Sequence, residues 1–205
     1  ASTFTIRFKG GTESGDTTQH TWQIDAALLH VWSGNEVLGS ATTVTSDAKA
    51  MALSYGKNRA VLRTTDPSNT LHVFQIESTN DILDWWKSTD NGQTWGKQIS
   101  SGFGPVSSFS VKKDSNNYIH IAWRHTGGAA YYKKQYYTDT SWASNVLIDL
   151  SNNYQPDVAI APYNNSWVYV VYDKHTTSGA KVNKVYVAIS TNGGSSFGSG
   201  TDLTY

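Results

Sequence analysis

Residues Ser88 to Trp95 read Ser-Thr-Asp-Asn-Gly-Gln-Thr-Trp, a stretch that encodes a tight turn between two strands. Asp90 carries a short carboxylate that can accept hydrogen bonds from nearby backbone N–H groups, and Gly92 can adopt the positive φ that such a turn needs. The hydroxyls of Ser88 and Thr94 can tie the two arms together, and the ring of Trp95 can pack under the turn. The sequence therefore predicts a β-hairpin at this position.

A degenerate copy of this turn occurs near the C-terminus, where Ser190 to Phe197 read Ser-Thr-Asn-Gly-Gly-Ser-Ser-Phe. Asn192 can do much of what the aspartate does, Gly194 follows it in the loop, and Phe197 replaces the tryptophan. A shortened version spans residues 138–142, where the glycine and part of the loop are missing. Copies of one turn indicate a repeat architecture.

The repeat extends into the flanking strands. Three apolar stretches, residues 69–75, 117–123 and 166–172, each follow a polar turn and start 48 and 49 residues apart. Further strands are expected on both sides of them, at residues 60–62, 106–111 and 158–160 upstream and at residues 82–87, 129–134 and 184–189 downstream. Each unit is thus strand, turn, strand, loop, strand, hairpin, strand. A four-stranded repeat of roughly 40 to 50 residues is the signature of a β-propeller.

We therefore expect an all-β chain, a β-propeller of four-stranded antiparallel blades, with residues 1–205 as a single domain. Three repeat blades are expected at residues 56–102, 103–150 and 151–205, after an irregular first blade at residues 1–55. About four blades are then visible, which leaves open a ring that closes at four or five, a segment of something longer, or a ring completed by partner chains. Open sheet edges would favour self-association.

The pattern Ser-x-Asp-x-Gly-x-Thr-Trp at Ser88, Asp90, Gly92, Thr94 and Trp95 resembles the Asp-box of sialidases and of the related bacterial neuraminidase repeat proteins. The resemblance covers residues 56–205 and implies a sialidase-like propeller. In these families the Asp-box is a structural hairpin that lies away from the substrate site. The resemblance therefore concerns fold more than function.

Composition limits the possible partners. The formal net charge is zero, the pI is near 7.2 and 16% of residues are charged, which argues against nucleic acid or an anionic membrane as a partner. No cysteine is present, so disulfides and thiolate chemistry are excluded. The histidines show no metal-ligand spacing, and no cofactor-binding motif is found, so we expect no metal and no cofactor. His72 and His120 occupy equivalent positions of two repeats, which indicates a packing role.

Glycoside hydrolysis is the sharper hypothesis that the resemblance raises. Active sialidases hold the substrate carboxylate with three arginines and use a tyrosine, a glutamate and an aspartate for catalysis. This chain has four arginines and three glutamates, and Arg7 lies in Thr-Ile-Arg-Phe-Lys-Gly without the proline of the family's Arg-Ile-Pro. Glu77 has no tyrosine nearby in sequence, although a propeller could bring Tyr131 or Tyr172 toward it. No catalytic residue is carried over.

Binding is the favoured class of function, because this chain is rich in aromatic side chains, which stack on sugar rings. In a strand successive residues face opposite ways, so one member of an aromatic pair can be core while the other reaches a surface. We expect a ligand surface where the end of one strand and the Gly127-Gly128 loop meet an aromatic pair. The candidate ligand-binding residues are Trp85, Trp86, Arg124, His125, Tyr131 and Tyr132.

The sequence thus predicts a non-catalytic recognition module that binds a glycan or surface polysaccharide, located outside the cell or on a cell or virion surface. The alternative is a structural subunit of an extracellular filament, a surface layer or a phage virion. A glycoside hydrolase is the second alternative. The aromatic supply favours the first of these.

Overall fold

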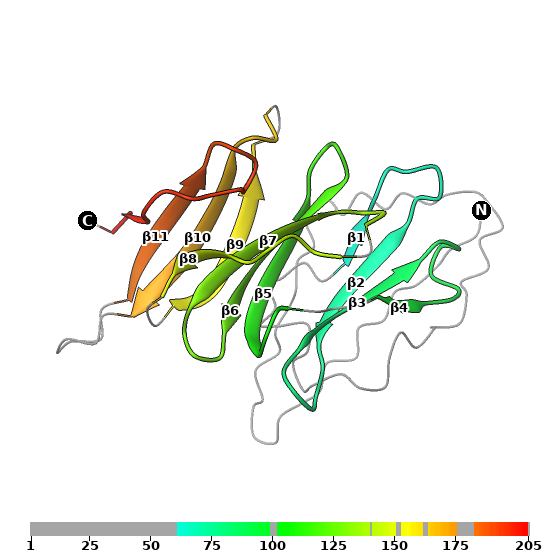
Figure 1. The fold of residues 1–205 in the computed structure, drawn as a ribbon, viewed down its shortest axis with the longest axis horizontal. Coiled ribbons are helices and arrows are strands. Elements are labelled where there is room, and N and C mark those ends of the chain that lie inside the picture. Colours follow the sequence, from blue (N-terminus) through cyan, green and yellow to red (C-terminus); the bar gives the residue numbers. More distant parts are fainter. Residues whose placement is uncertain are drawn as a thin grey trace, which may run out of the picture. The chain divides into compact units, whose positions relative to one another are not determined.

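The computed structural model describes residues 61–98, 102–139, 141–150, 153–161, 164–175 and 183–204. These residues form three antiparallel four-stranded sheets and contain no helix (Figure 1). None of these described residues forms a helix that could span a membrane. All of them belong to the second of two compact units, Ala1–Ser40 and Ala41–Tyr205. The prediction of an all-β fold is confirmed, whereas the predicted first blade at residues 1–55 lies outside the described residues.

Each sheet is a meander in which consecutive strands pair. Sheet 1 contains β1 (Val61–Arg63), β2 (Leu71–Ile76), β3 (Leu83–Ser88) and β4 (Gly96–Gln98). Sheet 2 contains β5 (Val106–Lys113), β6 (Tyr118–His125), β7 (Ala130–Tyr136) and β8 (Val146–Asp149). Sheet 3 contains β9 (Asn153–Ile160), β10 (Val168–His175), β11 (Asn183–Ser190) and β12 (Thr201–Asp202). The strands predicted from the aligned repeats are all present in the three sheets.

The turns before β2 and β6 depend on the conformational tolerance of asparagine. Asn69 has φ of 47° and Asn117 has φ of 65°, in the left-handed region that asparagine tolerates better than most residues. Asp66 and Asp114 precede them, and the carboxylate of each accepts a backbone N–H from two residues on, at 3.2 and 2.9 Å. The same local chemistry therefore closes the turn in sheet 1 and in sheet 2.

Sheets 1 and 2 are joined by an aromatic and aliphatic core. Trp85 and Phe74 of sheet 1 are stacked with ring centroids 6.0 Å apart, and Trp142, which follows β7, lies edge-on to Trp85 at 5.4 Å. From sheet 2, Ile121 and Trp123 are fully buried in the same cluster. Truncation of a buried Phe or Trp to Ala typically lowers the free energy of unfolding by about 3–5 kcal/mol, so each of these rings contributes substantially to stability. This core holds the two sheets face to face.

Sheets 2 and 3 are joined by a second core on the opposite face of sheet 2. Ala122 and Tyr132 of sheet 2 are fully buried against Val168, Val170 and Ala188 of sheet 3. Because side chains alternate along a strand, β6 supplies one core with Ile121 and Trp123 and the other core with Ala122. Sheet 2 is therefore covered on both faces by described residues.

The hairpins that follow β7 and β11 each pack on the preceding sheet. Trp142 of sheet 2 contacts Trp85 of sheet 1, and Phe197 of sheet 3 contacts Tyr132 of sheet 2 with ring centroids 5.0 Å apart. Lysines on β3 and β7 complete these contacts, because Lys87 Nζ donates to the carbonyl of Tyr137 at 2.7 Å. Lys134 Nζ likewise donates to the carbonyl of Gly193 at 2.7 Å. One set of contacts thus recurs at both sheet junctions.

The hairpins at residues 88–95 and 190–197 share one hydrogen-bond pattern. Asp90 Oδ1 accepts from the Thr94 N–H at 2.9 Å, and the Gly92 N–H donates to Ser88 Oγ at 2.8 Å. In the other hairpin Asn192 Oδ1 accepts from the Ser196 N–H at 3.0 Å, and the Gly194 N–H donates to Ser190 Oγ at 2.9 Å. Hydrogen bonds from Thr94, Ser88 and the backbone lower the pKa of Asp90 to about 2. Aspartate and asparagine therefore organise the same turn.

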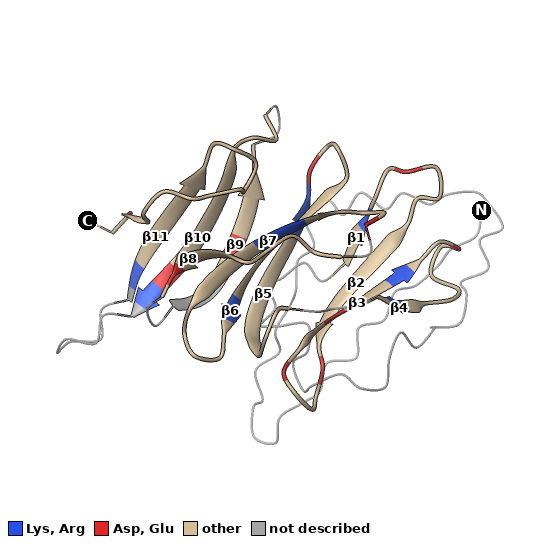
Figure 2. Cartoon of the chain, in the orientation of Figure 1, with Lys and Arg blue, Asp and Glu red and all other residues tan. Residues whose placement is uncertain are grey.

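Charged side chains are spread over the described sheets instead of forming one field. Figure 2 shows blue and red segments scattered among strands and turns that are mostly tan. This agrees with a chain of zero formal net charge. The described sheets therefore carry no extended region of one charge sign.

Substitution of the two hairpin glycines by alanine should change stability to different extents. Gly92 (φ 90°) has room for a Cβ, with its nearest contacts at 3.6 Å, whereas a Cβ on Gly194 (φ 84°) would lie 2.2 Å from the hydroxyl of Tyr132. We expect Gly92→Ala to lower the free energy of unfolding by about 1–2 kcal/mol for the left-handed backbone alone. Gly194→Ala should cost about 1–3 kcal/mol more, because Tyr132 is fully buried. Urea unfolding of both variants measures the difference, and equal losses would contradict the close packing on Tyr132.

His72 gives the fold a pH dependence. Its ring is fully buried, Trp85 Nε1 donates to Nδ1 at 3.1 Å, and burial together with the charge of Lys87 lowers its pKa to about 4. The unfolded chain, with an ordinary pKa near 6.5, therefore binds the proton first as the pH falls.

We expect the contribution of His72 to stability to be complete above pH 6.5 and to be lost as the pH falls to 4, by about 3 kcal/mol. Urea unfolding at a series of pH values measures this loss. The variant His72→Gln removes the titrating ring, so its free energy of unfolding should change much less across the same window. Parallel curves for the two proteins would show that His72 does not titrate there.

Candidate functional site

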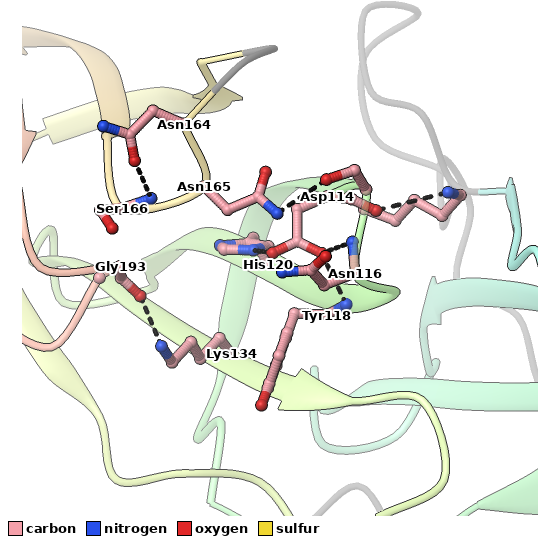
Figure 3. Close-up of polar contacts among 12 residues, drawn as sticks. Asp114, Asn116, Tyr118, His120, Lys134, Asn164, Asn165, Ser166 and Gly193 are labelled. Carbon is pink, nitrogen blue, oxygen red and sulfur yellow. Dashed lines mark hydrogen bonds and ion pairs between the residues drawn. The ribbon is translucent and has the colours of Figure 1, made fainter.

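An open cleft of about 480 Å³ lies between the turn edges of sheets 2 and 3. Its lining comes from the β5–β6 turn, from β6 and β7, from the turn before β10 and from the hairpin after β11 (Figure 3). The residues are Asp114, Asn116, Tyr118, His120, Lys134, Asn164, Asn165, Ser166, Asn192 and Gly193. The volume lies in the range of about 300–1,000 Å³ typical of small-molecule sites.

Asp114 organises the sheet 2 side of the cleft. Its Oδ1 accepts the backbone N–H groups of Asn116 and Tyr118, both at 2.9 Å, and its Oδ2 lies 3.3 Å from His120 Nε2. Burial raises the pKa of Asp114, but the hydrogen bonds from His120, Tyr118 and Asn116 outweigh burial and hold the pKa below its usual value. The carboxylate is therefore ionised and committed to the turn.

A buried chain of hydrogen bonds runs from this carboxylate into the core. His120 Nδ1 lies 2.6 Å from the Tyr132 hydroxyl, and with that hydroxyl as the donor the proton on Nε2 faces Asp114. Burial raises the pKa of Tyr132 and keeps its hydroxyl protonated. Sheet 1 repeats the arrangement, because Trp85 donates to His72 there. The chain of groups is thus a repeated packing device, as the equivalent positions of the two histidines indicated.

Three turns are linked across the two sheets around the cleft. Asn165 Nδ2 donates to Ser115 Oγ at 2.8 Å, the Gly193 N–H donates to the carbonyl of Ser166 at 2.7 Å, and Lys134 Nζ donates to the carbonyl of Gly193. Figure 3 shows Asn164, Asn165 and Ser166 on one side and Asn116 and Tyr118 on the other. These links fix the distance between the two walls.

Tyr118 supplies the aromatic surface of the cleft. The side chain is 37% exposed, its ring lies 5.1 Å from that of Tyr136, and Lys134 Nζ lies 5.4 Å from the ring centroid. Tyr118 and Lys134 also line a neighbouring cavity of about 270 Å³ that reaches Trp142. The cleft therefore combines amides and a hydroxyl with an accessible tyrosine ring.

Trp85 and Trp86, two of the predicted ligand-binding residues, lie on opposite faces of β3. Trp85 is 1% exposed and packs in the core between sheets 1 and 2. Trp86 pairs with Val73 across the sheet and lies under Lys97, with Nζ 5.8 Å from the ring centroid. Since it alternates with Trp85, it faces away from sheet 2. Neither tryptophan therefore forms a surface with Arg124 and His125, which lie at the end of β6.

The sheet 2 candidates are split in the same way. Tyr132 is fully buried, whereas Tyr131 is half-buried, stacks on Trp123 at 5.5 Å and lies 6.4 Å from the ring of His125. The loop at Gly127 folds back, with its N–H donating to His125 Nδ1 at 3.0 Å. Arg124 donates to Ser107 Oγ at 3.1 Å. Tyr131 and His125 are thus brought together, and Tyr132 belongs to the core.

Glu77, the glutamate considered for catalysis, is held in its own loop. Its Oε1 accepts from both the backbone N–H and the side chain of Asn80 at 3.1 Å. Within the described part of the chain, no group of three or more histidine or acidic side chains is arranged to hold a metal ion. None of the cleft residues was predicted from sequence to bind a ligand, although His120 was assigned a packing role and Asn192 a place in the second hairpin.

No protein-family model matches the sequence, and a search of curated proteins gives no match either. Among solved structures the chain is similar to the α-L-arabinanase of Penicillium chrysogenum complexed with arabinobiose, at 11% identity and a TM-score of 0.53, over 80% of this chain and 56% of that one. It is also similar to a K499G mutant of the NanB sialidase of Streptococcus pneumoniae, at 20% identity and a TM-score of 0.44, over 63% of this chain and 20% of that one. A fucose lectin from Kordia zhangzhouensis, in complex with methyl-fucoside, matches at 16% identity and a TM-score of 0.47, over 71% and 98% of the two chains.

The arabinanase match establishes the fold, which is a β-propeller as predicted. The chain spans 20% of the sialidase and 56% of the arabinanase, and the described sheets do not close into a ring. At these identities the similarity concerns the fold alone.

The role of Asp114 in the turn before Tyr118 can be tested by removing the Asp114 carboxylate. We expect Asp114→Ala to lower the free energy of unfolding by about 1–3 kcal/mol, because two partly buried backbone N–H groups and the buried ring of His120 lose their acceptor. Amide hydrogen exchange at Asn116 and Tyr118 should accelerate with it. Asp66→Ala, in the equivalent turn of sheet 1, should destabilise the fold similarly and leave those two amides protected. Unchanged exchange in Asp114→Ala would contradict the role of Asp114 in the cleft.

Proposed function

We propose that this chain is a carbohydrate-binding propeller module and that the cleft between sheets 2 and 3 is its binding site. The observation that carries the proposal is an exposed tyrosine ring, Tyr118, facing a rim of amide and hydroxyl groups in an open cleft. Sugar recognition uses an aromatic face for the C–H face of the ring and amides for the hydroxyls, since each amide offers both donors and an acceptor.

The charges of the cleft favour a neutral sugar. Lys134 and Asp114 are the cation and the carboxylate among its lining residues, and they offset one another. The ammonium of Lys134 already donates to Gly193, and the carboxylate of Asp114 is committed to the β5–β6 turn. Recognition of an acidic sugar relies on charge-assisted, often bidentate arginine contacts, and no arginine is among the described residues that line this cleft.

Binding is favoured over hydrolysis by the same residues. Hydrolysis of a glycosidic bond ordinarily needs two carboxyl groups about 5–10 Å apart, and Asp114 is the single carboxyl group among the described residues that line the cleft. Its low pKa also makes it a poor proton donor near neutral pH. The arabinanase that shares the fold is a complex with arabinobiose, which supports a carbohydrate ligand only at the level of the fold.

We further propose that the hairpins at residues 88–95 and 190–197 are Asp-boxes and that the module acts outside the cell or on a cell or virion surface. The matched hydrogen bonds of Asp90 and Asn192 support the first part. In Asp-box families this hairpin lies away from the substrate site. The cleft, which borders Asn192 and Gly193, is therefore a different location from the substrate site of those families.

The binding proposal predicts that Tyr118 is essential for affinity. On a glycan array followed by calorimetry with the best neutral mono- and disaccharides, we expect Tyr118→Ala to weaken binding at least about tenfold, or 1.4 kcal/mol. Tyr118→Phe should retain binding, because the ring face remains.

Trp86→Ala serves as the matched control, since Trp86 is a half-exposed aromatic residue of sheet 1. Loss of binding in Trp86→Ala but not in Tyr118→Ala would move the site to sheet 1. A preference for sialylated glycans would contradict the neutral cleft. Absence of any glycan binding would overturn the proposal.

A further inference from the structure

A second cavity, of about 270 Å³, adjoins the cleft at Tyr118 and Lys134, which line both. The two residues lie on the neighbouring strands β6 and β7, and Figure 3 shows both side chains at the cleft. The second cavity, here called the outer cavity, continues from them along the connection between β7 and β8. Its other lining residues are Gln135, Tyr136, Asp139, Ser141, Trp142 and Ala143. A ligand that fills the cleft can therefore extend past Tyr118 into the outer cavity.

One wall of the outer cavity is fixed by the core between sheets 1 and 2. The ring of Trp142 lies edge-on to Trp85 and to Phe103, with centroids 5.4 and 5.1 Å apart. The next residue, Ala143, is held to β7, because its N–H donates to the carbonyl of Lys134 at 3.3 Å. This part of the cavity is therefore formed before any ligand arrives, which lowers the entropic cost of binding.

Asp139 supplies the carboxylate of the outer cavity. Its backbone is held at both polar groups, because its N–H donates to the carbonyl of Tyr136 at 3.0 Å and its carbonyl accepts from Gln135 Nε2. The side chain is exposed and lines the cavity. A carboxylate has two acceptor oxygens, so it can accept hydrogen bonds from two neighbouring hydroxyls of one sugar ring. Such charge-assisted hydrogen bonds are roughly twice as strong as neutral ones.

Tyr118 and Tyr136 give the two cavities adjoining aromatic rings. The two residues pair across β6 and β7, so their side chains lie on the same face of sheet 2. Their ring centroids are 5.1 Å apart and their planes are inclined by 55°. Tyr118 borders both cavities, whereas Tyr136 borders the outer one. A sugar unit in each cavity can thus contact a tyrosine ring.

We propose that the outer cavity is a second sugar subsite, so that the module binds two linked units of a neutral glycan across Tyr118. Asp139 accepts hydrogen bonds from the hydroxyls of the second unit. The inference rests on the proposed sugar-binding function of the cleft and adds to it the length of glycan that is recognised. It also adds a selectivity, because an acidic group on the second unit would meet the Asp139 carboxylate and be repelled.

Calorimetry on the full chain with matched mono- and disaccharides tests the length of the site. The probes are glucose, mannose, galactose and arabinose, each compared with its own disaccharides. For the sugar that binds, we expect a disaccharide to bind at least about tenfold more tightly than the monosaccharide. Equal affinities would overturn the second subsite and leave the sugar-binding cleft in place. Absence of binding by every probe would instead overturn the proposed function, and this inference with it.

Two variants locate the gain in affinity. Asp139→Ala removes the acceptor, and Ala143→Trp fills the outer cavity with a large ring at an exposed position. Each should reduce the advantage of the disaccharide to less than about threefold and leave the affinity for the monosaccharide unchanged. Thr138→Ala is the matched control, since Thr138 is exposed beside Asp139 and is not among the described residues that line the cavity.

The control should keep the full advantage of the disaccharide, and circular dichroism shows whether each variant is folded. An undiminished advantage in both Asp139→Ala and Ala143→Trp would overturn the inference. An equal loss of monosaccharide and disaccharide affinity in a folded Asp139→Ala would overturn it as well, because Asp139 would then act on the cleft and not on a second sugar unit.

Discussion

Face-to-face burial of aromatic rings between successive sheets is the interaction on which the rest of the structure depends. No single sheet has a core of its own, because each meander buries its apolar side chains only against a neighbour. Trp85 and Trp142 at one junction, and Tyr132 and Phe197 at the next, exclude water from the two contacts. The turns, lysine contacts and cleft are positioned by these junctions and would lose their geometry without them.

The constraint also explains why the histidine, lysine and hairpin positions recur. A sheet that must pack on both neighbours has little freedom at its third strand, where Lys87 and Lys134 reach the hairpin of the following sheet. His72 and His120 lie opposite these lysines in the register and fill the same space in each sheet. A chemically suggestive chain of carboxylate, imidazole and hydroxyl in sheet 2 is therefore explained by packing, since sheet 1 builds it with a tryptophan.

The fold could be predicted from sequence because its signals are local and repeated. The turn chemistry of Asp90 and Gly92 and the spacing of the strands required no knowledge of tertiary contacts. The ligand-binding residues were harder to predict from sequence. The alternation of side chains along a strand indicates that one of Trp85 and Trp86 is buried, but it does not identify the neighbouring sheet that covers it. The cleft was not predictable, because it is formed by turns about 50 residues apart, at Asp114 and Asn164, that meet only when two sheets pack.

The open shape of the proposed sugar-binding cleft has a consequence for affinity. A shallow, open cleft with one accessible ring binds a sugar weakly, because few groups are desolvated and much of the ligand stays in water. A polysaccharide that engaged the clefts of several copies on one surface would bind with an avidity far above that of one site. A neutral glycan with many repeated units is therefore the ligand that the proposed function favours.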